Sequence, residues 1–200
     1  MSWGIRNVQM VVHRRHRKKG RGMTYLPTVG SIDQFLAGLA KEARNTPDGC
    51  FIEVGVYTGG SASILTEIAQ QQGRQVYLYD TFEGLPYCSN GDTHQVGEFC
   101  YTDYDYIKNA LPYANVVKGI FPDSAVEMPS VAFAHLDVDQ YESYIGCIQY
   151  LKPKMVKGGI MWFDDYELAG AKKAIDELIG ADNLEWFHYP DFNSKVFVRF

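Results

Sequence analysis

Four aspartates follow two apolar segments of this sequence, and their type and spacing suit metal chemistry. Asp137 and Asp139 close one β-prone segment, and the pair Asp164 and Asp165 closes another. Because ligands bind beyond the carboxyl ends of strands in an open α/β sheet, the four carboxylates are expected to converge. Carboxylates within about 4–6 Å of one another raise one another's pKa values or share a cation, and an all-oxygen set suits Mg²⁺ or a similarly hard ion. A divalent metal site is the leading interpretation, and solvated acids at strand ends are the alternative.

A glycine-rich turn follows the first expected strand, in the string Phe51-Ile52-Glu53-Val54-Gly55-Val56-Tyr57-Thr58-Gly59-Gly60-Ser61. Glycines let a ligand approach the backbone closely, and the N-terminus of the helix that follows favours negative charge. A dinucleotide fold expects the spacing G-x-G-x-x-G, whereas this string is E-x-G-x-x-x-G-G-S, with Glu53 inside the strand. A carboxylate there repels a pyrophosphate and suits a cationic ligand.

S-adenosylmethionine (SAM) fits such a turn, because it carries an ammonium, a sulfonium and a ribose diol but no phosphate. A second acid, Asp80, ends the next expected strand. The acid at this position of nucleotide-binding βαβ units accepts hydrogen bonds from the ribose hydroxyls, and we expect the same of Asp80. A pair of capped or salt-bridged acids at strand ends is the alternative.

The elements that must position these residues alternate in type along the chain, which predicts a doubly wound, mostly parallel seven-stranded sheet with an antiparallel C-terminal edge. The expected strands are Cys50–Gly55, Gln75–Asp80, Asn115–Gly119, Val131–Val138, Gly159–Asp164, Leu184–Tyr189 and Lys195–Phe200. The expected helices are a lead-in helix that begins at the cap residue Ser31, then Ser61–Gln72, Thr102–Leu111, Tyr141–Leu151 and Ala171–Ile179. The long irregular connection from Pro86 to Cys100 is typical of a lid or substrate wall.

Length and charge indicate one acidic domain with a basic N-terminal segment. The 200 residues carry a net charge of −5, but residues 1–21 hold seven Lys or Arg and no acid. We expect residues 1–21 to be a flexible tail and residues 22–200 to be a single domain. The tail lacks aromatic residues among its charges for base stacking, which argues against nucleic acid as a partner. It also lacks the features of a signal peptide, and no apolar run approaches the ~18 residues of a membrane span, so we expect a cytoplasmic protein.

Four cysteines show no metal-site spacing. Cys50 and Cys147 lie in apolar patterns typical of buried thiols, whereas Cys88 and Cys100 flank a polar loop. Free thiols are expected for all four, because a disulfide between Cys88 and Cys100 requires an oxidising compartment.

Five strings, taken in order, resemble the macrocin O-methyltransferase family of class I SAM-dependent enzymes, which methylate sugar hydroxyls on natural products. They are IEVGVYTGGS, YDTFEGLP, VVKGIFPDS, HLDVDQYES and VKGGIMWFDDYELAGAKKAIDEL, and they extend from about Gly49 to Leu178. The resemblance implies a SAM- and Mg²⁺-dependent O-methyltransferase that acts on a sugar or glycoside. It also implies a homo-oligomer, namely the dimer common in the family.

The resemblance further implies roles for individual residues. Asp137, Asp164 and Asp165 match the family's Mg²⁺ ligands, and Asp139 matches its general base, with Asp137 also at the catalytic centre. The residues that match SAM contacts are Glu53, Gly55, Tyr57, Gly59, Ser61, Asp80, Thr81, Phe82, Gly119, Phe121 and Asp137. A bound cation lowers the pKa of an oxygen by stabilising the alkoxide, which is what a poorly nucleophilic aliphatic hydroxyl needs.

This chain departs from the family pattern at Tyr57-Thr58, where the family usually has Trp-Arg, and it is shorter than most members. The acceptor is therefore the least defined part of the prediction. Two other functions stay open: methylation of a catechol or another phenol, and a binding module that keeps the fold without turnover. A dehydrogenase is disfavoured because Glu53 and the glycine spacing do not match a dinucleotide site. His135, in an apolar strand, and His94, in the irregular loop, are expected to be a core and a surface histidine.

Overall fold

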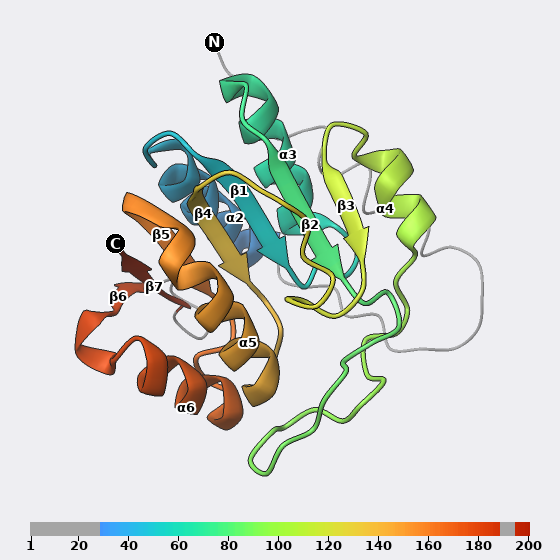
Figure 1. The fold of residues 1–200 in the computed structure, drawn as a ribbon, viewed down its shortest axis with the longest axis vertical. Coiled ribbons are helices and arrows are strands. Elements are labelled where there is room, and N and C mark those ends of the chain that lie inside the picture. The colour runs from blue at the N-terminus through green and yellow to red at the C-terminus, as the bar shows by residue number, and fades with distance from the viewer. Residues whose placement is uncertain (1–28, 189–194) are drawn as a thin grey trace.

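A single seven-stranded sheet runs through the protein (Figure 1), whose computed structural model describes residues 29–188 and 195–200. The strands are β1 (Cys50–Val54), β2 (Val76–Asp80), β3 (Asn115–Lys118), β4 (Val131–Leu136), β5 (Met155–Phe163), β6 (Glu185–Phe187) and β7 (Lys195–Arg199). Their order in the sheet is β3-β2-β1-β4-β5-β7-β6. The first five are parallel, and β7 runs antiparallel to both β5 and β6. This arrangement confirms the predicted fold class.

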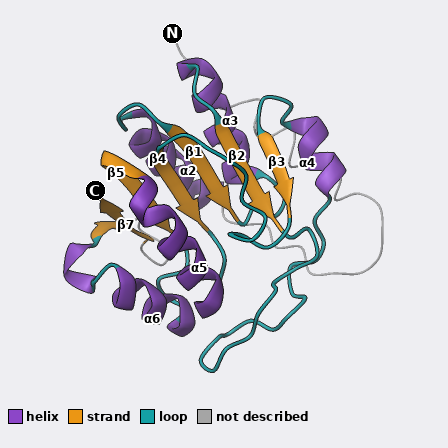
Figure 2. Cartoon of the chain, viewed as in Figure 1, coloured by secondary structure: helices purple, strands orange, loops and turns teal. Residues whose placement is uncertain are grey.

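Helices cover both faces of the sheet (Figure 2), because successive side chains of each strand point to opposite faces and both sets are apolar. On one face, Phe51 of β1 and Trp162 of β5 pack with α2 (Val29–Arg44), α3 (Gly60–Gln72) and α4 (Tyr104–Ala110). On the other face, Ile52 and Phe163 pack with α5 (Tyr141–Leu151) and α6 (Ala169–Leu178). Two 3₁₀ turns, η1 (Lys152–Lys154) and η2 (Ala181–Asn183), complete the elements in the described ranges.

Several predicted boundaries differ from the observed ones by one or two residues, and the start of β5 differs by four. β5 begins at Met155, four residues before the predicted start, because Met155 pairs with Val131 ahead of a register shift that the polar and glycine-rich start of this strand conceals. Helix α2 begins at Val29, so Ser31 lies inside the helix and does not precede it as a cap. The basic segment 1–21 and the turn 190–194 of the closing hairpin lie outside the described residues.

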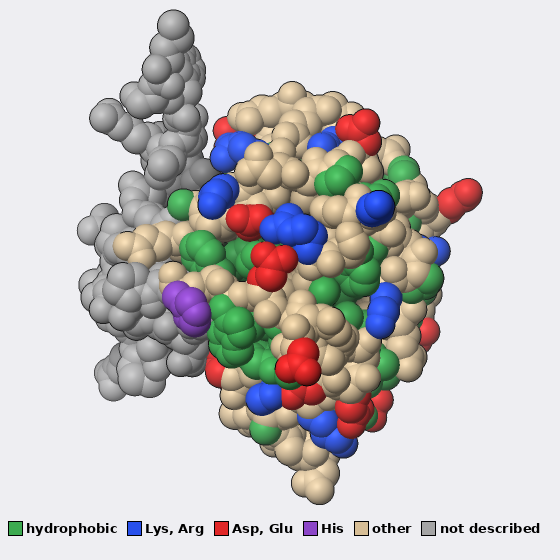
Figure 3. All heavy atoms as spheres, turned by 90° about the vertical axis from the view of Figure 1, so that its left-hand side faces the viewer, with side chains coloured by type: hydrophobic (Ala, Val, Ile, Leu, Met, Phe, Trp, Pro, Cys, Tyr) green, Lys and Arg blue, Asp and Glu red, His purple; other side chains and the backbone are tan. Residues whose placement is uncertain are grey.

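The surface and the thiols add two observations. On the face turned toward the viewer in Figure 3, acidic and basic side chains are interspersed and hydrophobic side chains gather between them, so this face shows no large field of one sign. The four cysteines are free, with Cys50 and Cys147 buried and Cys88 and Cys100 exposed, as predicted.

Among residues 29–188 and 195–200, no helix has the length and apolar character that crossing a membrane requires.

Candidate functional site

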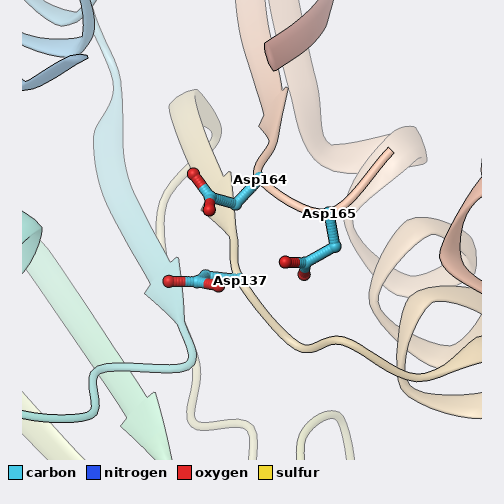
Figure 4. Close-up of side chains that lie close together, drawn as sticks. All are labelled: Asp137, Asp164 and Asp165. Atoms are coloured by element: carbon cyan, nitrogen blue, oxygen red, sulfur yellow. The ribbon is translucent and has the colours of Figure 1, made fainter. Parts of the chain in front are cut away.

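Three of the four predicted aspartates meet where β4 and β5 end. Asp137, Asp164 and Asp165 each offer a carboxylate oxygen, and these oxygens lie within 4.8 Å of one another (Figure 4). The meeting follows from topology, because β4 and β5 are parallel neighbours whose carboxyl ends lie at the same edge of the sheet.

Strand alternation sends the two consecutive acids of β5 to different partners. Asp164 continues the side of the sheet that carries Trp162, and Asp165 continues the side that carries Phe163. Asp164 therefore lies near Lys195, the first residue of β7, whose ammonium donates to Asp164 Oδ2 at 2.8 Å. Asp165 points toward α5, where the Tyr144 hydroxyl donates to Asp165 Oδ2 at 2.8 Å.

The hydrogen bonds of the cluster leave oxygens available for a cation. Asp165 Oδ2 also accepts from the backbone N–H groups of Val138 (3.1 Å) and Asp139 (2.9 Å), so its bonds concentrate on one oxygen. Asp164 Oδ1 is buried and has no hydrogen-bond partner among the described residues. Each of these two carboxylates is thus fixed through one oxygen, while the other accepts no hydrogen bond within the described residues.

Electrostatics show why the cluster favours a positive partner. Removal from water and repulsion from Asp164 and Asp165 raise the pKa of Asp137 well above its usual value. Burial, with repulsion from Asp139 and Asp164, raises the pKa of Asp165 to about 8. Burial acts in the same direction on Asp164, but His135 and Lys195 outweigh it and lower the pKa of that carboxyl. A bound cation would relieve the repulsion that raises the first two values.

Asp139 lies beside the cluster in an unusual backbone conformation. Its φ of 57° is in the left-handed region, which non-glycine residues seldom adopt. The hydrogen bond from its backbone N–H to Asp165 Oδ2 holds it there. Burial raises the pKa of Asp139 to about 6, although nearby His94 opposes the shift. Such a carboxyl can take up a proton near neutral pH.

The glycine turn after β1 closes against the same edge of the sheet. A side chain at Gly55, where φ is +91°, would place its Cβ 1.8 Å from the backbone oxygen of Asp137, so only glycine fits. Asp80 Oδ2 accepts from the backbone N–H groups of Val56 (2.8 Å) and Tyr57 (2.9 Å). Asp80 Oδ1 accepts from the backbone N–H of Phe82 at 2.7 Å, so the acid that ends β2 faces the turn after β1 and caps the backbone there, as in the predicted alternative.

A cavity of about 330 Å³ opens at this edge and contains most of the predicted site. The predicted residues that line it are Gly55, Tyr57, Asp80, Thr81, Gly119, Phe121, Asp137, Asp139, Asp164 and Asp165. Four predicted SAM contacts are not among its lining residues: Glu53, Gly59, Ser61 and Phe82. Gly59 precedes α3 with φ of 86°, and the buried Phe82 packs edge-on against Tyr104.

The predicted substrate-wall loop is fastened to the site by residues that the sequence analysis did not select. Asp92 Oδ1 accepts from the backbone N–H of Tyr141 at 2.8 Å, which caps α5 from outside the helix. The Gln140 side chain exchanges hydrogen bonds with the backbone of Tyr87. His94 of this loop lies 3.8 Å from Asp139, measured from Nε2 to Oδ1, and 2.8 Å from Glu98 Oε2 through Nδ1. The loop thus approaches the proposed general base.

Lys195 and Asp92 are the two charged residues that sequence reasoning missed. The position of Lys195 could have been predicted, because an antiparallel β7 beside β5 puts its first residue next to the last residues of β5. Asp92 carried no comparable signal, since it lies in an irregular loop 49 residues away from its partner.

Comparisons with known proteins agree on one family. The family model described as macrocin-O-methyltransferase (TylF) matches residues 12–186. The 8-demethyl-8-(2,3-dimethoxy-alpha-L-rhamnosyl)-tetracenomycin-C 4'-O-methyltransferase of Streptomyces olivaceus is 27% identical over 66% of this chain and 58% of its own length. The demethyldecarbamoylnovobiocin O-methyltransferase of Streptomyces niveus is 26% identical over 66% of this chain and 59% of its own length. The chain therefore spans less than two thirds of either relative.

Two solved structures share the fold. The O-methyltransferase NovP superposes with a TM-score of 0.71 at 21% identity, over 83% of this chain and 79% of that chain. The calicheamicin methyltransferase CalS11 superposes with a TM-score of 0.70 at 20% identity, over 84% and 78% of the two chains.

Proposed function

Because the chain belongs to the macrocin-O-methyltransferase (TylF) family, we propose that it transfers a methyl group from SAM to a sugar hydroxyl with the help of a divalent cation such as Mg²⁺. The observation that carries the proposal is the cluster of Asp137, Asp164 and Asp165 within 4.8 Å, in the cavity that the glycine turn and Asp80 also line. A SAM site and a metal site then share one cavity, which is what metal-assisted methyl transfer requires.

The proposed SAM site has the right charge and the right access. Gly55 and Asp80 both line the cavity. Asp80 Oδ2 accepts from two backbone N–H groups and Oδ1 from that of Phe82, so the acceptor position that remains, on Oδ1, is the one we propose for a ribose hydroxyl. Phe121, packed against Tyr79 with ring centroids 4.8 Å apart, offers an apolar wall for the adenine. The acids that line the cavity favour a cationic cofactor over a nucleotide phosphate.

The donor set fits a hard divalent cation. Asp137, Asp164 and Asp165 provide only oxygens, and Asp164 Oδ1 is buried without a partner within the described residues. A cation bound there supplies stabilisation of the negative charge that develops on the acceptor oxygen. Lys195 and Tyr144 hold two of the three carboxylates in place, so the ligands are ordered in advance.

Asp139 is the proposed general base. It lines the cavity beside the cluster, its backbone is fixed by Asp165, and its raised pKa of about 6 suits proton uptake near neutral pH. Asp139 would take the proton of the acceptor hydroxyl as that oxygen bonds to the methyl carbon, and the S–CH3 bond of SAM would break to leave S-adenosylhomocysteine. Holding the acceptor in line with that methyl group supplies a further part of the rate enhancement.

The acceptor class comes from the relatives. One is a rhamnosyl-tetracenomycin 4'-O-methyltransferase, and a solved structure with the same fold is a TDP-rhamnose 3'-O-methyltransferase. We therefore propose a deoxysugar, carried on a nucleotide or a glycoside, as the acceptor. The exposed rings of Tyr57 and Phe99, 6.0 Å apart at the cavity mouth, offer apolar contacts for such a sugar.

The test is transfer of a labelled methyl group from SAM to a panel of acceptors that contains TDP-rhamnose, a methyl rhamnoside and catechol. We expect transfer to a sugar hydroxyl that EDTA abolishes and Mg²⁺ restores. Transfer to catechol alone would replace the sugar with a phenol as the acceptor. Sugar methylation that persists in EDTA would remove the cation from the mechanism.

Location and assembly are part of the same proposal. We propose that the protein acts in the cytoplasm and, on the strength of the family resemblance, as a dimer. Light scattering after gel filtration checks the dimer, for which a single species of one-chain mass is the contrary result.

A further inference from the structure

Glu53 and His135 form a buried pair that lies outside the cavity. They are register partners on the adjacent strands β1 and β4, and both side chains are fully buried. His135 Nδ1 lies 3.0 Å from Glu53 Oε1, and the Ser61 hydroxyl, in the first turn of α3, donates to the same oxygen. Protein groups therefore engage Glu53 through Oε1, while its buried Oε2 has no hydrogen-bond partner among the described residues. Glu53 is not among the residues that line the cavity, whereas its neighbour Val54 is.

The other face of His135 points to the metal cluster. His135 Nε2 lies 3.6 Å from Asp164 Oδ1, and neither atom has a hydrogen-bond partner elsewhere in the described ranges. Lys195 holds the second oxygen, Oδ2, of the same aspartate. Each ring nitrogen of His135 thus faces a carboxylate oxygen, so the ring lies between Glu53 Oε1 and Asp164 Oδ1.

A buried chain of polar groups destabilises the fold unless the groups are closely paired. Transfer of charged groups from water is repaid only by close, well-oriented partners. Hydrogen-bonded groups behind a metal ligand orient that ligand, and their loss typically lowers metal affinity by about 10–100-fold. In this cluster, Asp164 is the aspartate that His135 contacts and can orient.

We propose that Glu53 and His135 are positioning residues for the metal ligand Asp164, and that Glu53 belongs to the metal half of the site and does not contact SAM. The inference rests on the proposed function, because it requires a cation at the three aspartates. It reassigns Glu53, which the family resemblance places among the SAM contacts. Ser61 orients Glu53, Glu53 orients the imidazole, and the imidazole fixes Asp164.

Two amide variants separate the two contacts of the ring. The side-chain amide nitrogen of an asparagine lies near the position of Nδ1, and that of a glutamine near Nε2, and both can donate a hydrogen bond. His135→Asn therefore keeps the contact with Glu53 and loses the one with Asp164, whereas His135→Gln does the reverse. Both variants also remove the ring, so each is the packing control for the other.

The readouts are Mn²⁺ affinity of the SAM-free protein by electron paramagnetic resonance, and affinity for S-adenosylhomocysteine by calorimetry without metal. We expect Mn²⁺ to bind His135→Asn about tenfold or more weakly than His135→Gln. Glu53→Gln is expected to weaken Mn²⁺ binding while affinity for S-adenosylhomocysteine changes less than about threefold. The exposed Thr93→Ala is the matched control and is expected to change neither affinity.

Equal Mn²⁺ affinities in the two His135 variants would overturn the proposal, as would a Glu53→Gln protein that loses S-adenosylhomocysteine and keeps Mn²⁺. If the variants fail to fold, a Mg²⁺ titration of the unmodified protein decides: the ring ¹⁵N resonances of His135 are expected to shift on saturation, and an unchanged spectrum refutes the link. Wild-type protein that binds no Mn²⁺ removes the proposed metal and this inference together. If the wild-type protein binds Mn²⁺ and the variants bind it equally well, only this inference is refuted.

Discussion

Replacing Asp137 with asparagine is expected to stabilise the metal-free protein and to abolish its response to Mg²⁺. The ligand oxygens of Asp137, Asp164 and Asp165 lie within 4.8 Å of one another, and two ionised carboxylates at that separation repel by about 3.5 kcal/mol at an effective dielectric constant of about 20. Attraction to His135 offsets part of this repulsion. The net gain is on the order of 2 kcal/mol, or about 4–8 °C in Tm for a domain of this size.

The gain depends on pH in a defined direction. Burial and the neighbouring acids raise the pKa of Asp137 in the folded state, so the folded protein retains a proton that the unfolded chain releases above pH ~4. The destabilisation that Asp137 causes in the folded protein therefore grows as pH rises. The Tm difference between Asp137→Asn and wild type is expected to widen from about pH 5 to pH 8.

The assay is thermal unfolding in EDTA and then in saturating Mg²⁺. Wild type is expected to gain stability with Mg²⁺, whereas Asp137→Asn does not. The exposed Asp182→Asn serves as the control and should follow wild type in both buffers. The reasoning is refuted by a variant that melts below wild type in EDTA, or by one that still responds to Mg²⁺ as wild type does.

Three further predictions test the surroundings of the site. Asp92→Ala removes the acceptor that caps α5, so Tm should fall by about 2–4 °C and amide exchange in residues 86–100 should speed up, and a melt identical to that of Thr93→Ala would contradict this role. Asp80→Asn should weaken S-adenosylhomocysteine about tenfold or more in calorimetry, because a hydrogen bond to a charged group contributes about 1.5–3 kcal/mol, and an unchanged Kd would exclude a ribose contact. Ellman's reagent should react quickly with the exposed Cys88 and Cys100 of the native protein and slowly with the buried Cys50 and Cys147. Burial raises the pKa of both slow thiols, that of Cys50 to about 11. Four fast thiols, or none, would contradict this prediction.

Most of the fold could be predicted from the sequence because the central strands β1, β2 and β4 are buried on both faces. Continuous apolar runs such as Val131–Leu136, separated by helical stretches, leave few arrangements other than a parallel sheet. The start of β5 was mispredicted because Lys157, Gly158 and Gly159 are polar or flexible, and their pairing depends on neighbouring strands. A local pattern carries no information about such tertiary pairing.

The site was predictable to the extent that topology alone places its residues. Asp137, Asp164 and Asp165 end neighbouring parallel strands, so their meeting follows from the sheet. The hydrogen-bond partner of Glu53 was not predictable, because His135 lies 82 residues away. The same holds for the loop fastened through Asp92, since irregular backbone has no periodicity from which its contacts could be inferred.

Thermal unfolding with S-adenosylhomocysteine, the product that methyl transfer leaves, tests the central claim most directly. At about 100 times its Kd, a ligand that binds only the folded state stabilises it by about 2.7 kcal/mol. The account predicts a Tm increase of about 5–11 °C for a domain of this size. An unchanged Tm at concentrations up to the solubility limit, with Mg²⁺ present, would contradict the account that this cavity binds SAM.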